Sequence, residues 1–584
     1  MRNIDNLEID FQLENTKTGM KTVKMSGYYL HSKYNPIREA ENFAGCFYKP
    51  NHLHILFGFG LGYITNELIK ILTENEFLIV VEPNYKLVET SIHLNLYNDL
   101  DREPRHSVLT GDIKEIDETI IQFIDSYKGK VQYNIAPNYN KIYPEYGNKL
   151  GTFIRERMLF TLMNINTIHQ FSDLWQTNLI NNLYHGFRSK PLSSLANSLT
   201  CPAIIVSGGP SLTKQLDLLK SVGNRALILC AGSTINTLLK NNIKPHLIVT
   251  IDGGIENYTV HFKDLNINDI PLIFSLNVHK DIPNEYNSKS IAFAEDIINK
   301  EWLCDLLEKD IGFLHGGPSV ANFAFEIAMF MTSGPICFIG QDLAYTNNKT
   351  HAEGNNHFKL LEEDGKENQL LVETDGYYDI SVKTSVAFLA MKRAFESLIS
   401  SSKKMGDNRK IINSTEGGVH IIGTERVKFE DFINELDKDF SIEIESITNF
   451  SFSDGQNWLA FERKINRLCE EAQNTLELSE KALHLIKSLK NSQKNKLIKL
   501  LEDIDSRLQK LLENQLMFFT LQPVLIRMNH RYLPNKNETD KEKYERVMEK
   551  SVDFYKGIGE AATKTETWLR DLLKKIQADQ AGKK

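Results

Sequence analysis

Cysteine is scarce in this chain of 584 residues, which contains only six. They are scattered at Cys46, Cys201, Cys230, Cys304, Cys337 and Cys469. Cysteines without regular spacing predict neither a disulfide framework nor a zinc site. Several of them fall within apolar segments, as reduced core residues of a cytoplasmic protein do.

Long apolar segments are also lacking. No apolar signal segment follows Met1-Arg2-Asn3-Ile4-Asp5, so a cytoplasmic location is expected. Residues 191–213 carry no charge, but Ser, Thr, Asn, Gly and Pro fill this stretch. Such a segment is too polar for a membrane span, and none is predicted.

An excess of positive charge is absent as well. The net charge is -8, which argues against a protein that binds nucleic acid through its overall charge. Hydrophobic residues make up 41% and charged residues 25%, an ordinary globular composition. The length allows three or four domains, each with its own core.

The N-terminal part, residues 1–160, has the pattern of a Rossmann-like domain. An apolar strand at residues 53–57 runs into Gly58-Phe59-Gly60-Leu61-Gly62, and a second strand at residues 77–81 ends in Glu82. A glycine-rich turn after the first strand and an acidic residue at the end of the second strand are typical of dinucleotide or adenosyl sites. The glycine spacing is closer to that of methyltransferases than of NAD enzymes, and a scaffold for partner contacts is the favoured interpretation.

The C-terminal part, residues 426–584, is predicted to form a helical bundle. It contains few glycines, and one apolar stripe steps by four and three residues. The stripe comprises Leu497, Leu501, Ile504, Leu508 and Leu511. The stripe has heptad spacing, but it extends over too few heptads to predict a coiled coil.

Two glycine turns mark the central part, residues 161–425. Ser207-Gly208-Gly209-Pro210-Ser211 and His315-Gly316-Gly317-Pro318-Ser319 each lead into a helical pattern. Glycine lets a ligand approach the backbone, and the start of a helix presents unpaired N–H groups to an anion. Such turns are also ordinary strand-to-helix junctions, so neither is specific alone.

Short apolar strands alternate with helical segments around these turns. They are expected at residues 202–206, 226–231, 246–251, 271–276 and 335–340. This pattern indicates an α/β domain whose mostly parallel sheet is covered on both faces. Ligands of such sheets lie beyond the carboxyl ends of the strands, where Ser207, Asp252 and Asp342 fall.

Five separated segments carry a resemblance to a known family. Residues 203–423 resemble the central domain of the motility accessory factor family, bacterial proteins that glycosylate flagellin. The flanking parts have the size and character that this family leads one to expect. The five matching segments include residues Ser207 to Ser211, Lys244 to Asp252, Phe338 to Tyr345, Lys349 to His351, and Asn413 to Glu416.

A weaker resemblance is to bacterial sialyltransferases that use a CMP-linked sugar. It rests on Gly209-Pro210-Ser211, Gly317-Pro318-Ser319 and Gly340-Gln341-Asp342, although Pro318 departs from the pattern. Together, the two resemblances imply transfer of a nonulosonic acid, of the pseudaminic or legionaminic type, from CMP to Ser or Thr of flagellin. The donor is then a CMP-activated sugar, and flagellin is the acceptor partner.

The resemblance implies roles for particular residues. The CMP phosphate is expected on the backbone and hydroxyls of the two turns, with Tyr345 as an extra donor. His351, or else His357, is the expected base for the acceptor proton. Asp252 and Asp342 are expected to bind ribose or sugar hydroxyls, or a divalent cation. The expected nucleotide contacts are Ser207, Gly208, Gly209, Pro210, Ser211, Asp252, Gly316, Gly317, Ser319 and Gln341, and the catalytic residues are His351, Asp342 and Tyr345.

Structural roles compete with these assignments. Asp252 precedes Gly253-Gly254 and is also a turn former, Tyr345 fits a packed aromatic, and His351 fits a solvated loop residue. A metal is not specified, because no Asp-x-Asp triplet of the usual nucleotide-sugar type is present.

Two other functions stay open. The central part also resembles archaeal hydroxymethylpterin pyrophosphokinases, which would make the chain a small-molecule phosphotransferase. Such a kinase has no use for two large flanking domains. The other alternative is a non-catalytic assembly factor that binds flagellin.

Overall fold

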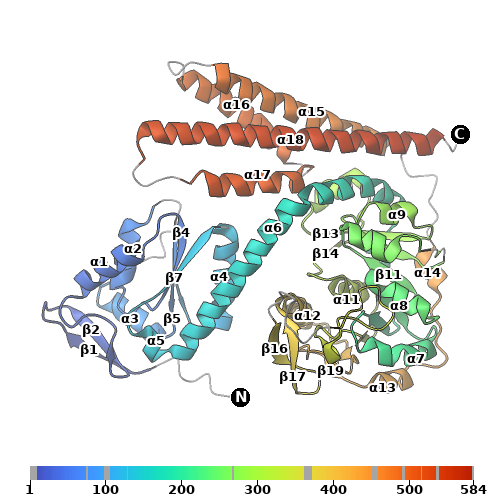
Figure 1. Cartoon of the computed structure of the whole chain (residues 1–584), viewed down its shortest axis with the longest axis horizontal. Helices are drawn as coiled ribbons and strands as arrows, with labels where there is room; N and C mark the ends of the chain where they lie inside the picture. Colours follow the sequence, from blue (N-terminus) through green and yellow to red (C-terminus); the bar gives the residue numbers. More distant parts are fainter. Residues whose placement is uncertain are drawn as a thin grey trace. The chain divides into compact units, whose positions relative to one another are not determined.

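The structure is a computed structural model that describes residues 9–73, 76–97, 105–127, 129–265, 267, 269–360, 371–449, 458–488, 494–513, 516–533 and 538–581. The chain forms two compact units (Figure 1). Unit 1 comprises Met1–Ser172, Leu483–Ser488 and Leu521–Gly557. Unit 2 comprises Asp173–Ala482, Leu489–Thr520 and Ile558–Lys584. The first boundary between them falls within the long helix α6, Pro144–Arg188.

Unit 1 contains the predicted Rossmann-like sheet. Its strands pair in parallel in the order β6-β5-β4-β7, so the first strand of the series lies inside the sheet. The strands are β4 (His52–Phe57), β5 (Phe77–Glu82), β6 (His106–Thr110) and β7 (Lys130–Ile135). The helices are α1 (Pro36–Phe47), α2 (Tyr63–Ile71), α3 (Tyr85–His93), α4 (Ile113–Tyr127) and α5 (Tyr139–Ile142). An antiparallel sheet of β1 (Phe11–Asn15), β2 (Lys21–Met25) and β3 (Tyr28–Tyr29) precedes them.

The glycine-rich turn of unit 1 is occupied by the chain's own side chains. The buried Glu82 carboxylate accepts from the amides of Phe59 at 2.9 Å and Gly60 at 3.2 Å, and from the Tyr139 hydroxyl. The next amide, that of Leu61, donates to His31 Nε2 at 2.8 Å. A ligand phosphate at this turn would have to displace these groups.

Unit 2 is built on a larger sheet in which all strand pairs are parallel. The order is β14-β13-β12-β11-β10-β9-β15-β18-β19, and β8 pairs with β13. The central strands are β9 (Ala203–Val206), β10 (Leu227–Ala231), β11 (Leu247–Thr250), β12 (Leu272–Ser275) and β15 (Ile336–Ile339). The outer strands are β8 (Lys190–Pro191), β13 (Ser290–Glu295), β14 (Phe313–Leu314), β18 (Ile411–Asn413) and β19 (Glu425–Arg426). The predicted strands are therefore confirmed.

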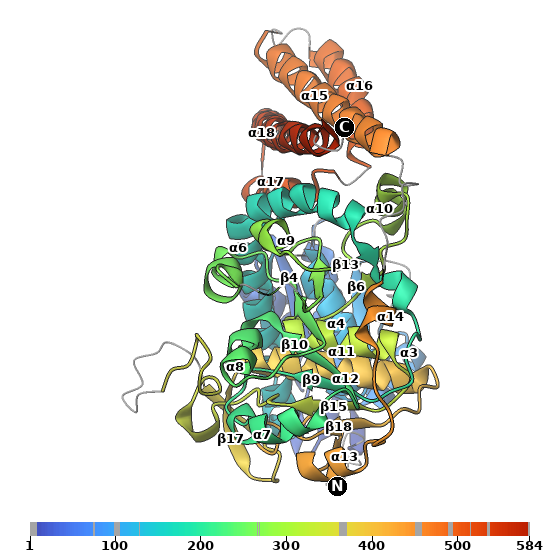
Figure 2. The ribbon, with the colours of Figure 1, turned by 90° about the vertical axis from the view of Figure 1, so that its right-hand side faces the viewer.

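Helices cover both faces of this sheet, with α7 and α8 on one side and α11 and α12 on the other (Figure 2). Ile205, Leu229 and Val249 of the sheet share a hydrophobic core with Phe325 of α11 and Phe395 of α12. The helices of this region are α7 (Leu212–Val222), α8 (Ile235–Lys240), α9 (Asp281–Glu285), α10 (Lys300–Leu307), α11 (Val320–Met331), α12 (Val386–Lys404), α13 (Phe429–Asn434) and α14 (Ile444–Thr448). A hairpin of β16 (Leu371–Asp375) and β17 (Ser381–Ser385) precedes α12.

The C-terminal region is helical, as predicted. It consists of α15 (Trp458–Ser488), α16 (Lys494–Leu512), α17 (Phe518–Arg531) and α18 (Asp540–Ala581). On α16, Leu497, Leu501, Ile504 and Leu508 of the apolar stripe are buried. The α/β class with a C-terminal helical region is thus confirmed.

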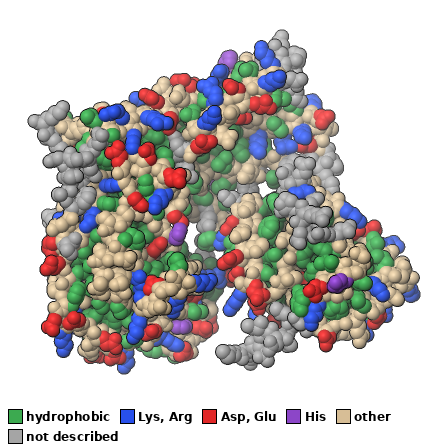
Figure 3. All heavy atoms as spheres, turned by 180° about the vertical axis from the view of Figure 1, so that it is seen from behind, with side chains coloured by type: hydrophobic (Ala, Val, Ile, Leu, Met, Phe, Trp, Pro, Cys, Tyr) green, Lys and Arg blue, Asp and Glu red, His purple; other side chains and the backbone are tan. Residues whose placement is uncertain are grey.

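Among the described residues, no helix has both the length and the hydropathy needed to cross a membrane. On the face drawn in Figure 3, acidic and basic side chains are interspersed.

Glu82 makes the stability of unit 1 depend on pH. Burial raises the pKa of its carboxyl from 4.5 to about 7. The folded state therefore binds the proton more tightly, so the stabilisation is complete below pH 4.5 and is lost as the pH rises through 7. We expect Glu82→Gln, which stays neutral, to remove about 3 kcal/mol of pH-dependent stability over this range.

Scanning calorimetry of the full chain between pH 4 and 8 measures this effect. Glu89→Gln removes the same charge from an exposed position of α3 and is the matched control. An unchanged pH dependence in Glu82→Gln would contradict the assignment.

Candidate functional site

The site of unit 2 lies where the strand order reverses direction. Strand β9 has β10 on one side and β15 on the other. The chain continues from β9 to β10 and on to β14, and only then returns to β15 on the opposite side of β9. Open parallel sheets bind ligands at such a switch point, beyond the strand ends. Ser207 directly follows β9, as the sequence predicted, and Gly340 directly follows β15, which ends one residue earlier than the expected strand.

The first glycine turn is held to the loop after β15. The Gly209 amide donates to the Gly340 carbonyl at 2.8 Å, and the Ser207 hydroxyl donates to Gln341 Oε1 at 2.5 Å. The Ser211 hydroxyl donates to Asp342 Oδ1 at 2.7 Å, and the Ser211 amide also points at this carboxylate. Several predicted phosphate donors of this turn are thus already engaged.

Asp342 is 1% exposed, so its carboxylate forms hydrogen bonds with protein groups and not with solvent. Besides Ser211, it accepts from the Thr346 hydroxyl at 2.7 Å. Burial raises the pKa of the Asp342 carboxyl, while these hydrogen bonds act in the opposite direction. Its geometry is that of a residue that positions the turn.

The second glycine turn is also partly occupied. Both carboxylate oxygens of Glu326, on α11, accept from the turn: Oε1 from the His315 amide at 3.1 Å and Oε2 from the Gly316 amide at 2.5 Å. Ser319 is the N-cap of α11, and its hydroxyl oxygen accepts from the Asn322 amide at 3.3 Å. The Asn322 amide also donates to the Ser319 carbonyl at 3.1 Å, so the amides that α11 leaves for an anion are those of Val320 and Ala321.

Two cavities meet at these turns. The smaller, of about 190 Å³, is lined by Ser207 to Pro210, Val320, Ala321, Gly340 to Asp342 and His351. The larger, of about 610 Å³, is lined by Asp252, Gly317, Pro318 and His357, among others. Ser233, Ser319, Val320 and Met391 line both cavities, so the two cavities are adjacent.

Some predicted site residues lie outside both linings. Ser211 is bonded to Asp342, and Gly316 is bonded to Glu326. The Tyr345 ring packs with its centroid 5.4 Å from that of Phe388, a residue that does line the small cavity. Tyr345 is thus placed behind the cavity wall.

Three histidines gather between the cavities. His351 lines the small cavity, and the amide of the next residue, Ala352, donates to the Gly208 carbonyl at 2.9 Å. His357 lies 3.1 Å from His261, measured between their Nε2 atoms. His261 is carried by a π-helical turn, Asn257–Phe262, an irregularity that is often found at functional sites.

Burial keeps two of these imidazoles neutral. It lowers the pKa of His261 to about 4, with a further contribution from His357 and His351. Burial also lowers the pKa of His351, assisted by the charge of His357. A neutral imidazole has a free lone pair, so His351 is able to accept a proton near pH 7.

The large cavity is rich in carboxylates and carboxamides. Asp252 is exposed, and its Oδ1 accepts from the Gly254 amide at 2.8 Å, as in an Asx turn. Burial raises the pKa of the Glu295 carboxyl, which accepts from the Ser275 hydroxyl at 2.8 Å. None of the described residues that line either cavity is Lys or Arg. In the part of the chain that the structure describes, no three His, Cys, Asp or Glu side chains are grouped to hold a metal ion.

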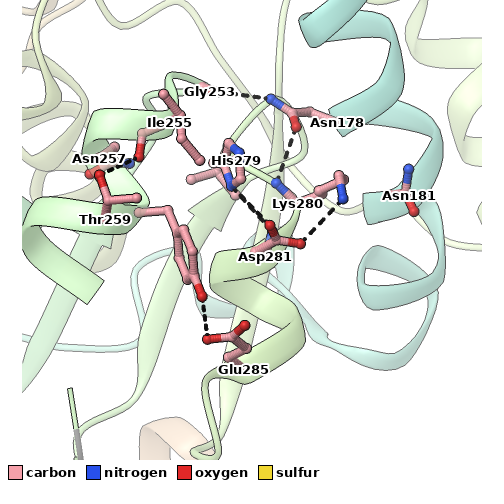
Figure 4. Close-up of polar contacts among 12 residues, drawn as sticks. Asn178, Asn181, Gly253, Ile255, Asn257, Thr259, His279, Lys280, Asp281 and Glu285 are labelled. Carbon is pink, nitrogen blue, oxygen red and sulfur yellow. Dashed lines mark hydrogen bonds and ion pairs between the residues drawn. The ribbon is translucent and has the colours of Figure 1, made fainter. Parts of the chain in front are cut away.

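Helix α6 holds the loop after β11 and the loop after β12 through Asn178 (Figure 4). Asn178 donates to the Gly253 carbonyl at 3.0 Å and accepts from the Lys280 amide at 3.1 Å. His279 contacts Asp281, and its ring stacks on that of Tyr258. These contacts join the loop after β11 to the loop after β12.

No sequence motif indicated several residues that line the large cavity. Trp175, His261 and Phe519 come from segments without any motif. Asn277 directly follows the predicted strand at residues 271–276, so the rule that ligands lie beyond strand ends would have found it.

Comparisons with known proteins agree with this architecture. A family model described as 6-hydroxymethylpterin diphosphokinase MptE-like matches residues 177–348. The structure of a MAf glycosyltransferase from Magnetospirillum magneticum AMB-1 superposes with a TM-score of 0.58 at 14% identity, covering 97% of this chain and 92% of that chain. No curated protein matches the sequence.

The chain therefore has a glycosyltransferase fold, of which the matching regions extend over almost its full length. More particularly, the chain shares its fold with the MAf glycosyltransferase, so the resemblance to the motility accessory factor family is confirmed at the level of the fold.

The glycines of the first turn provide a paired test. A Cβ on Gly209 would meet the Asp342 carboxylate and the Gly340 carbonyl, whereas a Cβ on Gly208 would meet side-chain atoms of Asn355 and Thr234 at 3.1 and 3.2 Å. We expect Gly209→Ala to cost at least about 3 kcal/mol and Gly208→Ala at most about 1 kcal/mol.

Thermal unfolding measures both costs. Gly208 is expected to contact the CMP phosphate, and it lines the small cavity, so on that hypothesis Gly208→Ala should also weaken CMP binding about tenfold in a calorimetric titration. Wild-type binding by Gly208→Ala would show that the small cavity does not receive the phosphate.

Proposed function

We propose that this chain is a protein O-glycosyltransferase. It moves a nonulosonic acid of the pseudaminic or legionaminic type from its CMP-activated donor to Ser or Thr hydroxyls of flagellin in the cytoplasm. The observation that carries the proposal is the meeting of a glycine turn, a free helix start and a neutral histidine at the switch point. The Maf fold supports the same class of reaction.

The leaving phosphate belongs at the junction of the two cavities. Gly208, Val320 and Ala321 line this region with their backbone, whereas the Ser319 hydroxyl donates to Asn322 Oδ1 at 2.7 Å and caps α11. Hydrogen-bond donors and a helix dipole stabilise the charge that grows on the phosphate oxygen as the bond to the anomeric carbon breaks. Because no Lys or Arg lines the site, these donors carry most of that stabilisation.

His351 is the group proposed to take the acceptor proton. The new bond joins the hydroxyl oxygen of Ser or Thr to the anomeric carbon, the hydroxyl proton moves to the imidazole, and CMP leaves with the bonding electron pair. His351 lines the cavity of the phosphate and is neutral near pH 7, as this role requires. Asp342, Ser211 and Tyr345 act behind it by holding the turn and the wall in place.

Asp252 and Glu256 are the candidates for hydrogen bonds to sugar or ribose hydroxyls. Both are exposed side chains of the large cavity. A divalent cation, if the reaction uses one, would bind at Asp252, because the Asp342 carboxylate is buried among hydroxyl donors.

A diphosphokinase is the second candidate, because the matching family model carries that description. Both functions use a phosphate site at the end of a parallel sheet. The two functions differ in their substrates. The kinase would convert a hydroxymethylpterin and ATP to a pterin diphosphate and AMP, whereas the transferase would release CMP from a sugar donor.

Intact-mass spectrometry tests the proposed function. Flagellin co-expressed with this chain and with a pathway that supplies CMP-pseudaminic or CMP-legionaminic acid should gain a ladder of sugar-sized increments. The increments should require both the chain and the donor. Unmodified flagellin that co-purifies with the chain would instead favour a binding or assembly factor.

The assignment of the base has its own test. We expect His351→Asn to lower kcat by about 10²- to 10⁴-fold with little change in donor binding. His315→Asn, at an exposed residue bonded to Asp296, is the control. A large loss in His357→Asn and none in His351→Asn would move the role to His357.

The pH profile of the wild type gives an independent check. Since burial lowers the pKa of His351 below 6.5, kcat/KM should stay level down to pH 6.5 and fall only at lower pH. A fall that begins above pH 7 would contradict a neutral His351 base.

A further inference from the structure

Two histidines from distant segments form a hydrogen-bonded pair at the large cavity. His261, on the π-helical turn, and His357, in the loop after β15, both line this cavity. Their Nε2 atoms lie 3.1 Å apart, and their ring centroids are 4.9 Å apart at an angle of 66°. This distance is that of a hydrogen bond, so one ring donates its N–H and the other accepts with its lone pair.

Other hydrogen bonds hold the loop of His357 beside the π-helical turn and the cavity junction. The Asn356 Nδ2 donates to the Val260 carbonyl at 2.8 Å. The Asn355 Oδ1 accepts from the His357 amide at 2.9 Å, and the Asn355 Nδ2 donates to the Ser233 carbonyl at 3.0 Å. Since Ser233 lines both cavities, His357 is placed close to the point where they meet.

The second ring nitrogens of the two histidines differ in their surroundings. His261 is 5% exposed, and its Nδ1 is buried without a hydrogen-bond partner among the described groups. His357 is half-buried, and its Nδ1 is accessible, because it makes no hydrogen bond with a described group and is not buried. The Nδ1 of His357 is therefore the nitrogen of the pair that a ligand can reach.

These surroundings decide which ring donates the shared hydrogen. If His357 donated, His261 would carry its own hydrogen on Nδ1, where a buried N–H would lack an acceptor. If His261 donates, its Nδ1 holds only a lone pair, and no buried N–H of the pair is left without an acceptor. Burial lowers the pKa of His261 to about 4, so this ring carries a single N–H near pH 7. His357 then accepts at Nε2 and carries its hydrogen on the accessible Nδ1.

A fixed N–H near the cavity junction has a use in the transfer reaction. Negative charge grows on the phosphate oxygen as the bond to the anomeric carbon breaks, and preorganised donors stabilise that charge. None of the described lining residues of either cavity is Lys or Arg. A neutral N–H also suits this cavity, because an imidazolium would be attracted by the Asp252 and Glu256 carboxylates that line it.

We infer that His261 is a positioning residue, which fixes His357 as a hydrogen-bond donor to the reacting phosphate. His261 donates to His357 Nε2, and His357 presents its Nδ1–H near the junction of the cavities. This N–H adds to the backbone amides of Val320 and Ala321 and keeps its proton, while His351 remains the base. The inference rests on the proposed function, because the charge that it stabilises arises in the transfer.

The positions of the ring hydrogens can be measured without any reaction. In the full chain labelled with ¹⁵N-histidine, long-range ¹H–¹⁵N spectra distinguish a protonated from an unprotonated ring nitrogen. The signals that are missing in His357→Asn assign His357. We expect a protonated Nδ1 and an unprotonated Nε2 near pH 7, and a hydrogen on His357 Nε2 would overturn the inference.

Side chains that imitate one ring nitrogen test the pair by kinetics. The amide nitrogen of Gln lies near the position of a histidine Nε2, and that of Asn lies near Nδ1. For sugar transfer, we expect His261→Gln to keep kcat within about threefold and His261→Asn to lower it about tenfold. For His357 the order is reversed: Asn should keep most of kcat, and Gln should lower it about 10²-fold. The KM for the donor should change little, because the N–H acts on charge that develops in the transition state.

His246→Gln is the matched control for these variants. Burial lowers the pKa of His246 to about 4 as well, but this residue lies outside both cavity linings. Its kcat should equal that of the wild type. A thermal melt of each variant gives the folded fraction by which kcat is corrected.

The outcomes separate this inference from the transferase itself. Equal losses of kcat in His261→Gln and His261→Asn would show a merely structural role for His261 and would contradict the inference. Wild-type kcat in His357→Gln would also contradict it and leave the transferase standing. The expected tautomer in a wild-type chain that transfers no sugar would refute the proposed function and the catalytic role of the pair, but not the hydrogen bond between the rings.

Discussion

The contact on which the site of unit 2 depends is that of the Asp342 carboxylate with the first glycine turn. This carboxylate is buried, and it binds the Ser211 hydroxyl and amide from one strand end and Thr346 from its own loop. The Asp342 carbonyl accepts from the Val419 amide at 2.8 Å, which brings in the segment after β18. Three loops that are far apart in the sequence are thereby held at one point, and the walls of the small cavity follow from their positions.

The same structural device has two different outcomes in this chain. Each unit places a glycine turn after an inner strand of a parallel sheet, β4 in unit 1 and β9 in unit 2. In unit 1, Glu82, Tyr139 and His31 occupy the turn. In unit 2, a buried aspartate takes only part of the turn, and the Gly208 backbone still lines a cavity. A glycine pattern therefore identifies the turn, but the side chains that fold onto it determine whether a ligand has room.

The polarity of the two cavities is consistent with a donor that binds across both. Neutral histidines and helix amides lie at one end, and carboxylates, carboxamides and aromatic rings lie at the other. Since no described lining residue carries a permanent positive charge, oriented backbone dipoles are the main source of attraction for an anion. Such dipoles are fixed by the fold, which explains why so many buried hydrogen bonds surround the turns.

The sequence by itself determined the α/β class, the Rossmann-like first part, the helical last part and the strand ends at Ser207, Asp252 and Asp342. Each of these follows from local patterns of apolar residues and glycines, which act over a few neighbours along the chain. Only the tertiary structure decided that Glu82 and Glu326 occupy amides of two glycine turns, and that Asp342 is internal. It also brought Trp175 and Phe519, 344 positions apart, to one wall of the large cavity with Asn277 and Glu295. Such neighbours are set by packing between distant segments, which no local pattern encodes.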